Sequence, residues 1–315
     1  MLRLACAALV AAALLTACSG PDLTRSVSAR ATVDATAGGD DSGPVDPAFA
    51  EDKLRAADPC GLLDAKLLGN VGTPGGTPAG DPFQGCRADV TVGGQKMTVQ
   101  VRLGDAVPEA DRDAIALAGL RVIESKEDTS CTDKAVTQSS PSRAIVLRTE
   151  AKTGGDPCAV GKQVLAAVIA RMRTAPPAIR AGSSVMAGKD PCTLVDQATV
   201  TSIVGAKPRL DSESLYDCAW RLSGVSLDVS ARIGIDPAVP GFGDPPTPVD
   251  LGGVKAYRST TATGCEVAWA DMPLRDDSGE IVTVKVLNSP GGSGVDVCDR
   301  AVAAGKIVAS KLPRS

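Results

Sequence analysis

Two seven-residue stretches decide the fold: DPCGLLD at Asp58–Asp64 and DPCTLVD at Asp190–Asp196. In each, the leading aspartate can accept hydrogen bonds from free amides at a helix N-terminus. Proline suits the first helical position because its missing N–H would have no partner there. Two similar starts, at Asp156–Cys158 and Asp296–Cys298, precede apolar residues at helical spacing. The repetition indicates that one structural unit, beginning and ending with a helix, occurs twice.

Eight cysteines follow the same repetition, in two sets of four with gaps of 26, 45 and 27 residues and of 26, 47 and 33 residues. An even number of regularly spaced cysteines in an exported chain favours closed disulfides. Four cysteines allow three pairings in each unit, and the sequence does not select one. We expect nearest neighbours to pair: Cys60 with Cys86, Cys131 with Cys158, Cys192 with Cys218, and Cys265 with Cys298. A reactive thiol at a helix N-terminus is the alternative, but the chain has no Cys-x-x-Cys.

Between the helix starts, apolar residues alternate with polar ones at period two. Within Val225–Ile235, the apolar residues alternate with Ser226, Asp228, Ser230 and Arg232. Met97–Leu103 shows the same pattern in the first unit. Several strands in succession favour antiparallel pairing. The sequence therefore predicts an α+β fold of two homologous domains, each an antiparallel sheet with an N-terminal and a C-terminal helix, held by disulfides.

We expect these units at residues 51–174 and 190–315, joined by a linker at 175–189 in which Pro176 and Pro177 end a helix. The segment 18–50 is rich in Ser, Ala, Asp, Gly and Pro, and Phe49 is its only aromatic residue. Such a composition buries too little apolar surface to offset the entropy of ordering. We therefore expect a flexible tether there.

The composition argues against several classes of function. The 315 residues include 33 Lys and Arg against 37 Asp and Glu, and no basic block of the kind that binds nucleic acid is present. Histidine is absent from the sequence, which removes the commonest general base and metal ligand. We expect no enzyme activity, no cofactor and no metal site.

The N-terminus has the pattern of an export signal. Arg3 precedes an apolar run from Leu4 to Leu15 that is shorter than the ~20 residues of a membrane span. The sequence that follows, Leu15–Cys18, resembles the lipobox of bacterial lipoproteins. The resemblance implies that the signal peptide 1–17 is removed and that Cys18 carries palmitate-type acyl chains, which anchor the protein on the outer face of the cell membrane. The alternative is an ordinary secretory signal with an unmodified cysteine.

The lipobox, the tether and the Pro-Cys helix starts together resemble a group of actinobacterial cell-envelope lipoproteins, a domain of unknown function that occurs here as two copies. In relatives a tryptophan commonly lies two residues after the second cysteine. Trp220 holds this position in the second unit, whereas the first unit has Ala88. The resemblance implies an envelope location and a fold type, with no agreed activity.

The aromatic residues are concentrated in the second unit. Trp220 and Trp269 follow Cys218 and Cys265 by two and four residues, so each shares a strand face with its cysteine. The simpler interpretation places both indoles in the core. The alternative is an aromatic ligand pocket formed by Trp220, Trp269, Tyr216 and Tyr257.

Two other kinds of motif have structural interpretations. The glycine-rich stretches at 69–80 and 289–294 lack the Gly-Lys-Ser/Thr of a phosphate loop and are typical of turns. The acidic residues Asp276, Asp277 and Glu280 could form a metal site or a carboxylate pair, but they predict a solvated hairpin tip.

The sequence thus predicts a membrane-anchored, extracytoplasmic lipoprotein that acts as a non-catalytic binding or interaction module. The expected partner is an envelope protein, lipid or glycan, and we expect no nucleic acid. Two alternatives remain: a carrier of a small apolar or lipid ligand in the second domain, and an envelope hydrolase that uses carboxylates.

Overall fold

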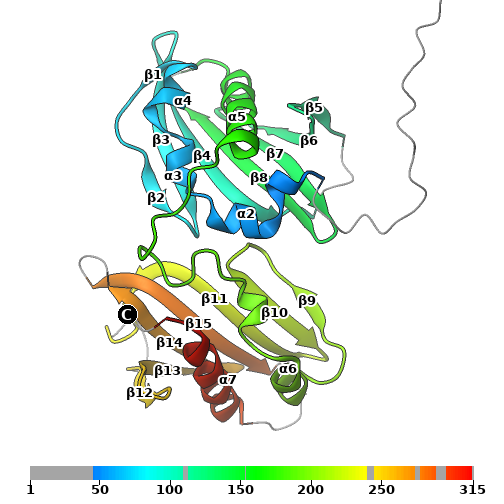
Figure 1. Ribbon diagram of the computed structural model, residues 1–315, viewed down its shortest axis with the longest axis vertical. Helices are drawn as coiled ribbons and strands as arrows, with labels where there is room; N and C mark the ends of the chain where they lie inside the picture. Colours follow the sequence, from blue (N-terminus) through cyan, green and yellow to red (C-terminus); the bar gives the residue numbers. More distant parts are fainter. Residues whose placement is uncertain are drawn as a thin grey trace, which may run out of the picture. The chain divides into compact units, whose positions relative to one another are not determined.

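The computed structural model describes residues 45–108, 113–152, 154–239, 245–273, 277–288 and 296–313 (Figure 1). The chain separates into two units, Met1–Asp40 and Asp41–Ser315, and all described residues belong to the second. The expected signal peptide, Cys18 and most of the tether lie outside the described residues. Among the residues described, no helix has the length and hydropathy needed to cross a membrane.

The first repeat consists of short helices, a sheet and one long helix. Its elements are η1 (Pro47–Phe49), α2 (Glu51–Ala56), α3 (Pro59–Leu62), α4 (Ala65–Gly69), β1 (Thr73–Pro74), β2 (Ala79–Asp81), β3 (Gly85–Val92), β4 (Gln95–Ala106), β5 (Ile115–Leu117), β6 (Leu120–Lys126), β7 (Ser130–Ser139), β8 (Ser142–Ala151) and α5 (Pro157–Thr174).

The second repeat follows the same plan with fewer short helices. Its elements are η2 (Pro191–Thr193), α6 (Gln197–Val204), β9 (Arg209–Asp211), β10 (Asp217–Leu222), β11 (Val225–Ile235), β12 (Thr247–Asp250), β13 (Lys255–Thr261), β14 (Gly264–Pro273), β15 (Ser278–Asn288) and α7 (Val297–Lys311).

The two sheets have the same topology. The first runs β1-β3-β4-β8-β7-β6-β5 with β2 beside β3, and the second, read from its β9 edge, runs β9-β10-β11-β15-β14-β13-β12. The strand pairs in both sheets are antiparallel. The predicted α+β fold of two similar domains is confirmed.

The strand registers give residue-by-residue equivalences between the repeats. Cys86 faces Val101 in the first sheet as Cys218 faces Val229 in the second. One irregularity is shared, because the bulge at Thr137 on β7 corresponds to the bulge at Asp271 on β14, whereas the bulge between Leu103 and Asp105 on β4 has no counterpart on β11. The sheets can therefore be compared position by position.

The four disulfides join the expected nearest neighbours: Cys60–Cys86, Cys131–Cys158, Cys192–Cys218 and Cys265–Cys298. Each links a residue near a helix N-terminus to a strand. The aspartate before each of these helical cysteines accepts from the cysteine amide two residues on, as expected of a cap: Asp58, Asp156, Asp190 and Asp296. The turn at Cys192 is a short 3-10 helix, and the α-helix begins only at Gln197, where Asp196 provides a new cap.

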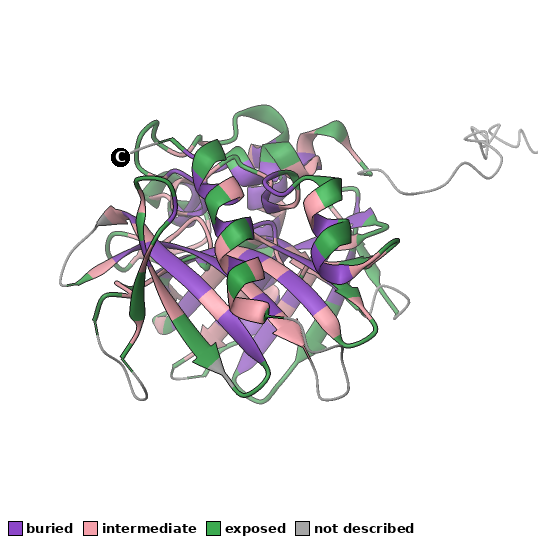
Figure 2. Cartoon of the chain, turned by 90° about the horizontal axis from the view of Figure 1, so that it is seen from below, coloured by how far each residue is buried: buried purple, intermediate pink, exposed green. Residues whose placement is uncertain are grey.

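Helices cover one face of each sheet. α5 packs on β7 and β8, whereas α6 packs on β11 and α7 on β14 and β15 (Figure 1). The strand residues that face these helices form the two main cores, and Figure 2 shows the resulting buried stretches along the strands. Side chains alternate between the faces of a strand, so the intervening polar residues lie on the opposite face, termed here the open face.

Two segments expected outside the domains contribute to the cores. Phe49, assigned to the tether, has 0% exposed surface, and Val45 donates its N–H to the Thr137 carbonyl at 2.9 Å. In the linker, Val185 and Met186 are buried in the second core. The ordered structure therefore begins before residue 51, because an aromatic side chain in a polar segment can still fill a core.

Candidate functional site

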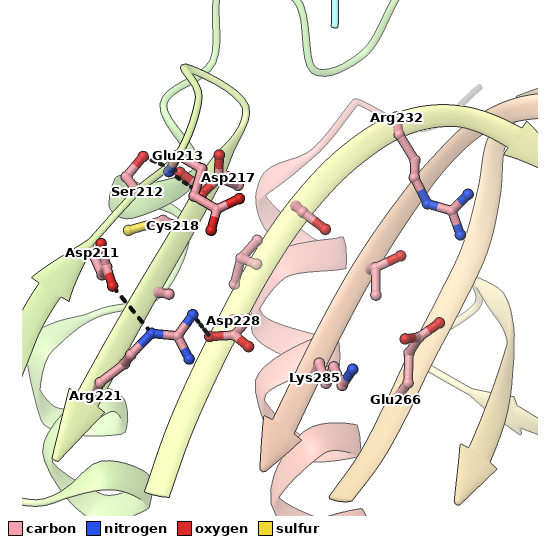
Figure 3. Close-up of a pocket in the computed structure, with 14 residues that line it drawn as sticks. Asp211, Ser212, Glu213, Asp217, Cys218, Arg221, Asp228, Arg232, Glu266 and Lys285 are labelled. Atoms are coloured by element: carbon pink, nitrogen blue, oxygen red, sulfur yellow. Dashed lines mark hydrogen bonds and ion pairs between the residues drawn. The ribbon is translucent and has the colours of Figure 1, made fainter. Parts of the chain in front are cut away.

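A charged hollow of about 310 Å³ lies on the open face of the second sheet (Figure 3). Its walls come from β9, β10, β11, β14 and β15 and from the loop before β10. The charged side chains that line it are Asp211, Glu213, Asp217, Arg221, Asp228, Arg232, Glu266 and Lys285. Both signs of charge are present, and acidic residues outnumber basic ones.

Strand register places the central charges in one row. Asp228 on β11 faces Lys285 on β15, and Lys285 faces Glu266 on β14. The charge therefore alternates from negative to positive to negative across three neighbouring strands. Opposite charges on facing strand positions stabilise the sheet modestly, and they also present a patterned surface.

Asp228 is a partly buried acid in the hollow. Its pKa is raised, mainly because burial penalises the charged carboxylate, although Arg221 and Lys285 oppose the shift. Arg221 lies between Asp211, at 3.4 Å, and Asp228, at 3.9 Å (Figure 3). Asp228 Oδ1 has no hydrogen-bond partner in the described part of the chain, and the buried hydroxyl of Thr283 has none either. Such atoms can bind a partner that supplies hydrogen bonds.

Asp217 shapes the edge of the hollow. Its carboxylate accepts from the amide of Glu213 at 2.8 Å and from the amide of Ser214. The Ser212 hydroxyl donates to the carbonyl of Asp217 at 2.6 Å. The loop that carries Glu213 is therefore held in place by its own polar groups.

The first sheet has a hollow of about 300 Å³ at the equivalent place, with a different charge. It is lined by Gln100, Arg102, Ser125, Thr132, Lys134, Val146 and Arg148, so its lining contains no carboxylate from the described residues. By register, Gln100 corresponds to Asp228, Thr132 to Glu266 and Arg148 to Lys285. The two acids of the alternating row are thus replaced by neutral residues in the first repeat.

The four aromatic residues expected as ligand contacts are not brought together. Trp220 and Trp269 are buried in the second core, where the simpler interpretation placed them. Tyr216 packs edge-on against a phenylalanine ring at 4.8 Å, and its hydroxyl donates to a backbone carbonyl at 2.9 Å. Tyr257 is half-buried, with Lys255 Nζ 5.3 Å from its ring centre. A pocket shared by all four does not form, because these side chains take part in different packing contacts.

Glu280 was expected at a solvated hairpin tip, and for this residue the expectation is wrong. It is 2% exposed, and its carboxylate accepts from the amides of Met186 at 2.7 Å and Val185 at 3.1 Å. Asp277 is exposed as expected, whereas Asp276 and the glycine-rich stretch 289–294 lie outside the described residues. Glu280 fixes the linker instead of facing solvent.

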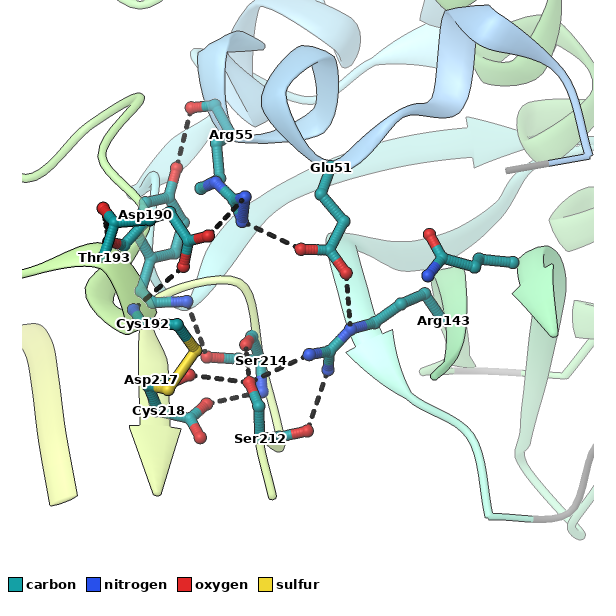
Figure 4. A network of polar contacts seen from close by, with 12 residues as sticks. Glu51, Arg55, Arg143, Asp190, Cys192, Thr193, Ser212, Ser214, Asp217 and Cys218 are labelled. Carbon is teal, nitrogen blue, oxygen red and sulfur yellow. Dashed lines mark hydrogen bonds and ion pairs between the residues drawn. A yellow bond between two sulfur atoms is a disulfide. The ribbon is translucent and has the colours of Figure 1, made fainter. Parts of the chain in front are cut away.

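A polar network joins residues of the two repeats (Figure 4). Arg143 on β8 donates to the carbonyl and the hydroxyl of Ser212, both at 2.9 Å, and lies 3.5 Å from Glu51. Arg55 contacts Glu51 at 3.1 Å and Asp190 at 3.5 Å. These buried guanidinium groups serve structural contacts.

Over the described ranges, the group with metal-ligand geometry is Glu124, Cys131 and Cys158. The two cysteines are joined in a disulfide, so their sulfur atoms are not available as thiolate ligands. This group is therefore a poor metal site.

The residues that line the charged hollow were not selected from the sequence. The sequence identifies a set of polar residues only as the partners of apolar residues in an alternating strand: Ser226, Asp228, Ser230 and Arg232. Their convergence with Lys285 and Glu266 depends on pairing between distant strands. The usable signal was the alternation itself, which indicates a polar open face without saying which charges meet there.

Comparison with known proteins gives no assignment. The chain matches no family model, and neither a curated protein nor a solved structure matches it.

Proposed function

We propose that the chain is a non-catalytic interaction module of the cell envelope, whose second repeat binds a protein partner through the charged hollow. The observation that carries this proposal is the lining atom Thr283 Oγ1, which is buried and has no hydrogen-bond partner among the described residues. Beside it, Asp228 Oδ1 accepts no hydrogen bond from them and has a 3.9 Å ion pair with Arg221. A buried polar atom without a partner costs free energy that a bound group can recover. The open face thus offers hydrogen-bonding atoms to a group from outside.

The charge pattern favours a polar partner with charges of both signs. Alternation along Asp228, Lys285 and Glu266 is complementary to a surface that presents positive, negative and positive groups in turn. An apolar ligand would leave these charges desolvated and unpaired. The hollow therefore supports interaction with a protein more than carriage of a lipid.

Anchoring through Cys18 and membership in the actinobacterial lipoprotein group belong to the same proposal. The four disulfides are compatible with an extracytoplasmic location, since such bonds persist in oxidising compartments. Replacing Cys18 with alanine should move the protein from the membrane fraction to the soluble fraction. Retention of the Cys18→Ala form in membranes would contradict the anchor.

The binding role is tested by charge reversal at matched positions. The full-length protein is crosslinked in intact cells as wild type, as Lys285→Glu and as Arg148→Glu, the register equivalent in the first repeat. We expect Lys285→Glu to lose a crosslinked protein adduct that Arg148→Glu keeps. Equal adducts in all three proteins, or loss only in Arg148→Glu, would contradict binding at this hollow.

A further inference from the structure

A second hollow in the second repeat has a different chemistry. It measures about 300 Å³ and lies between the end of α7, the start of β13 and the strand β14. Its apolar surface comes from Trp269, Val254, Ala309, Leu312 and Pro313, while Asp271 provides a carboxylate and Lys255 an ammonium group. The volume is at the small end of the range for ligand sites, which suits a small molecule.

Asp271 is the unusual group in this lining. It is 8% exposed, sits at the bulge of β14, and accepts a hydrogen bond from the Trp269 side chain. Its Oδ2 has no hydrogen-bond partner among the residues that the structure describes. A buried carboxylate oxygen beside an apolar hollow is costly unless a donor binds there.

The first repeat shows how the equivalent place can be filled. Thr137 occupies the matching bulge, and its carbonyl accepts from Val45, at the start of the segment that carries Phe49. Arg173 near the end of α5 lies 5.2 Å from the Phe49 ring centre and 2.8 Å from Asp46. An aromatic ring and an ion pair from one segment thus cover this end of the first repeat.

The second repeat differs in this region. Trp269 stands where the first repeat has the small Ala135, so the indole can take part of the space that Phe49 fills there. The residues that precede the second repeat at the matching distance, 177–181, are Pro, Ala, Ile, Arg and Ala, and they supply no aromatic ring. The remaining hollow has a carboxylate where the first repeat has a threonine.

We propose that this hollow is a binding site for a small molecule with an aromatic or apolar body and a protonated amine. The body would pack against Trp269 and Leu312, and the ammonium group would donate to Asp271 Oδ2. A charge-assisted hydrogen bond in a place this enclosed is stronger than a neutral one. The site is separate from the charged hollow and does not depend on the proposed protein partner.

The neighbouring charges favour a cation over an anion. Glu280 on β15 adds negative charge near Asp271, and its oxygens already accept from two linker amides. Lys255 on β13 also lines the hollow, but its ammonium group lies over the Tyr257 ring, and Lys311 on α7 donates to a backbone carbonyl at 3.1 Å. Both cations have these partners, so Asp271 is the lining charge whose buried oxygen accepts no hydrogen bond from the described residues.

Burial and Glu280 raise the pKa of Asp271 to about 6. The carboxylate is therefore ionised at pH 7.5 and mostly protonated at pH 5, whereas an alkylamine stays charged over this range. Amine binding should weaken about tenfold between these two pH values, because about a tenth of Asp271 remains ionised at the lower one.

The test uses three probes of one shape: phenethylamine, its neutral analogue 2-phenylethanol, and the anion phenylacetate. The full chain with Cys18→Ser to prevent acylation and Trp220→Phe to isolate Trp269 is titrated while indole fluorescence is recorded. We expect saturable quenching by phenethylamine, weaker quenching by the alcohol and none by the anion. Absence of saturable quenching, or equal affinity for all three probes, would overturn the proposal.

Asp271→Asn should lower phenethylamine affinity about tenfold and remove both its preference over the alcohol and its pH dependence. The matched control is Asp277→Asn, which removes an exposed carboxylate and should leave binding unchanged. Near-ultraviolet circular dichroism checks that each variant is folded. If Asp271→Asn disrupts the fold, the three probes and the pH series are still measured on the protein that retains Asp271, and these measurements test the site. An unchanged affinity in folded Asp271→Asn would contradict the site.

Discussion

The two repeats share a scaffold and differ in what its polar positions do. Their strand order, their disulfides and the bulge on β7 and β14 correspond, yet Arg143 in the first repeat occupies the position of Glu280 in the second. Both are buried, and both bind backbone groups of a segment outside their own sheet. Arg143 donates to the Ser212 carbonyl, whereas Glu280 accepts from Val185 and Met186. A duplicated position can therefore keep its role while its charge reverses.

The two repeats also differ at one buried position in their cores. Asp133 on β7 is 0% exposed and corresponds to Val267 on β14, as the registers with β8 and β15 show. The α5 backbone comes close here, because a Cβ on Gly161 would lie 2.6 Å from Asp133 Oδ2. Asp133 therefore has little room for a solvating neighbour, and only the first repeat has an acid at this position.

The largest expected effect tests where the folded part of the first repeat begins. Phe49→Ala should destabilise the protein by about 3–5 kcal/mol, because it removes a fully buried aromatic ring. Urea unfolding measures the loss. Val45→Ala, at a side chain that is largely exposed, is the control and should change little. A loss of stability below about 1 kcal/mol for Phe49→Ala would show that the segment around Phe49 is part of the flexible tether and not of the folded domain.

The charge reversal can be tested from both sides. Arg143→Met should cost roughly 3 kcal/mol, since it removes a buried guanidinium group that donates twice to Ser212 and pairs with Glu51. Glu280→Gln should cost about 1–3 kcal/mol by weakening its bonds to two amides. Lys53→Met, at an exposed ion pair, should be nearly neutral. Urea unfolding measures the stability of the three variants. No loss of stability for either buried residue would show that Arg143 and Glu280 do not share a structural role.

The buried acid of the first repeat predicts a pH effect. Burial raises the pKa of Asp133 to about 6, with Glu124 adding to the shift and Lys162 opposing it. A folded-state pKa above the unfolded value gives stability that is present below about pH 4 and lost as pH rises through about 6. Asp133→Asn should therefore stabilise the protein by up to about 3 kcal/mol at pH 7.5 and much less at low pH.

Urea titrations of Asp133→Asn and wild type at several pH values measure this difference. Asp277→Asn serves as the exposed control. The buried-acid account fails if the gain from Asp133→Asn is the same at pH 4 as at pH 7.5.

The smallest expected effect is the loss of a helix cap, which should be the same in both repeats. Asp156 accepts from the first-turn amides of Cys158 and Ala159, and Asp296 accepts from those of Cys298 and Asp299. Alanine at either aspartate should cost about 1 kcal/mol. Thermal unfolding of the two variants should give similar shifts, and a clear inequality would show that the caps are not equivalent.

Local patterns in the sequence were sufficient to predict the scaffold. The Asp-Pro-Cys starts, cysteine spacing and period-two strands led to the repeated α+β fold and to the nearest-neighbour disulfides that are observed. These features are local because a cap, a turn of helix and a strand face are each set by residues within a few positions.

The features that were missed depend on contacts between distant residues. Phe49 looked like part of a polar tether, and its burial depends on a core formed much later in the chain. Glu280 looked like a hairpin residue, and its burial depends on the linker folding back over it. The charged hollow likewise depends on the register that brings Asp228, Lys285 and Glu266 into one row.

The most direct test of the central claim places a photoreactive residue at Glu266 and, in a second protein, at its first-repeat equivalent Thr132. Both side chains are half-buried on their open faces, so the two probes are matched in exposure. Irradiation of intact cells should give a protein adduct from position 266 that Lys285→Glu abolishes, with no such adduct from position 132. An adduct of the same identity and yield from both positions, or none from 266, would contradict binding by the second repeat.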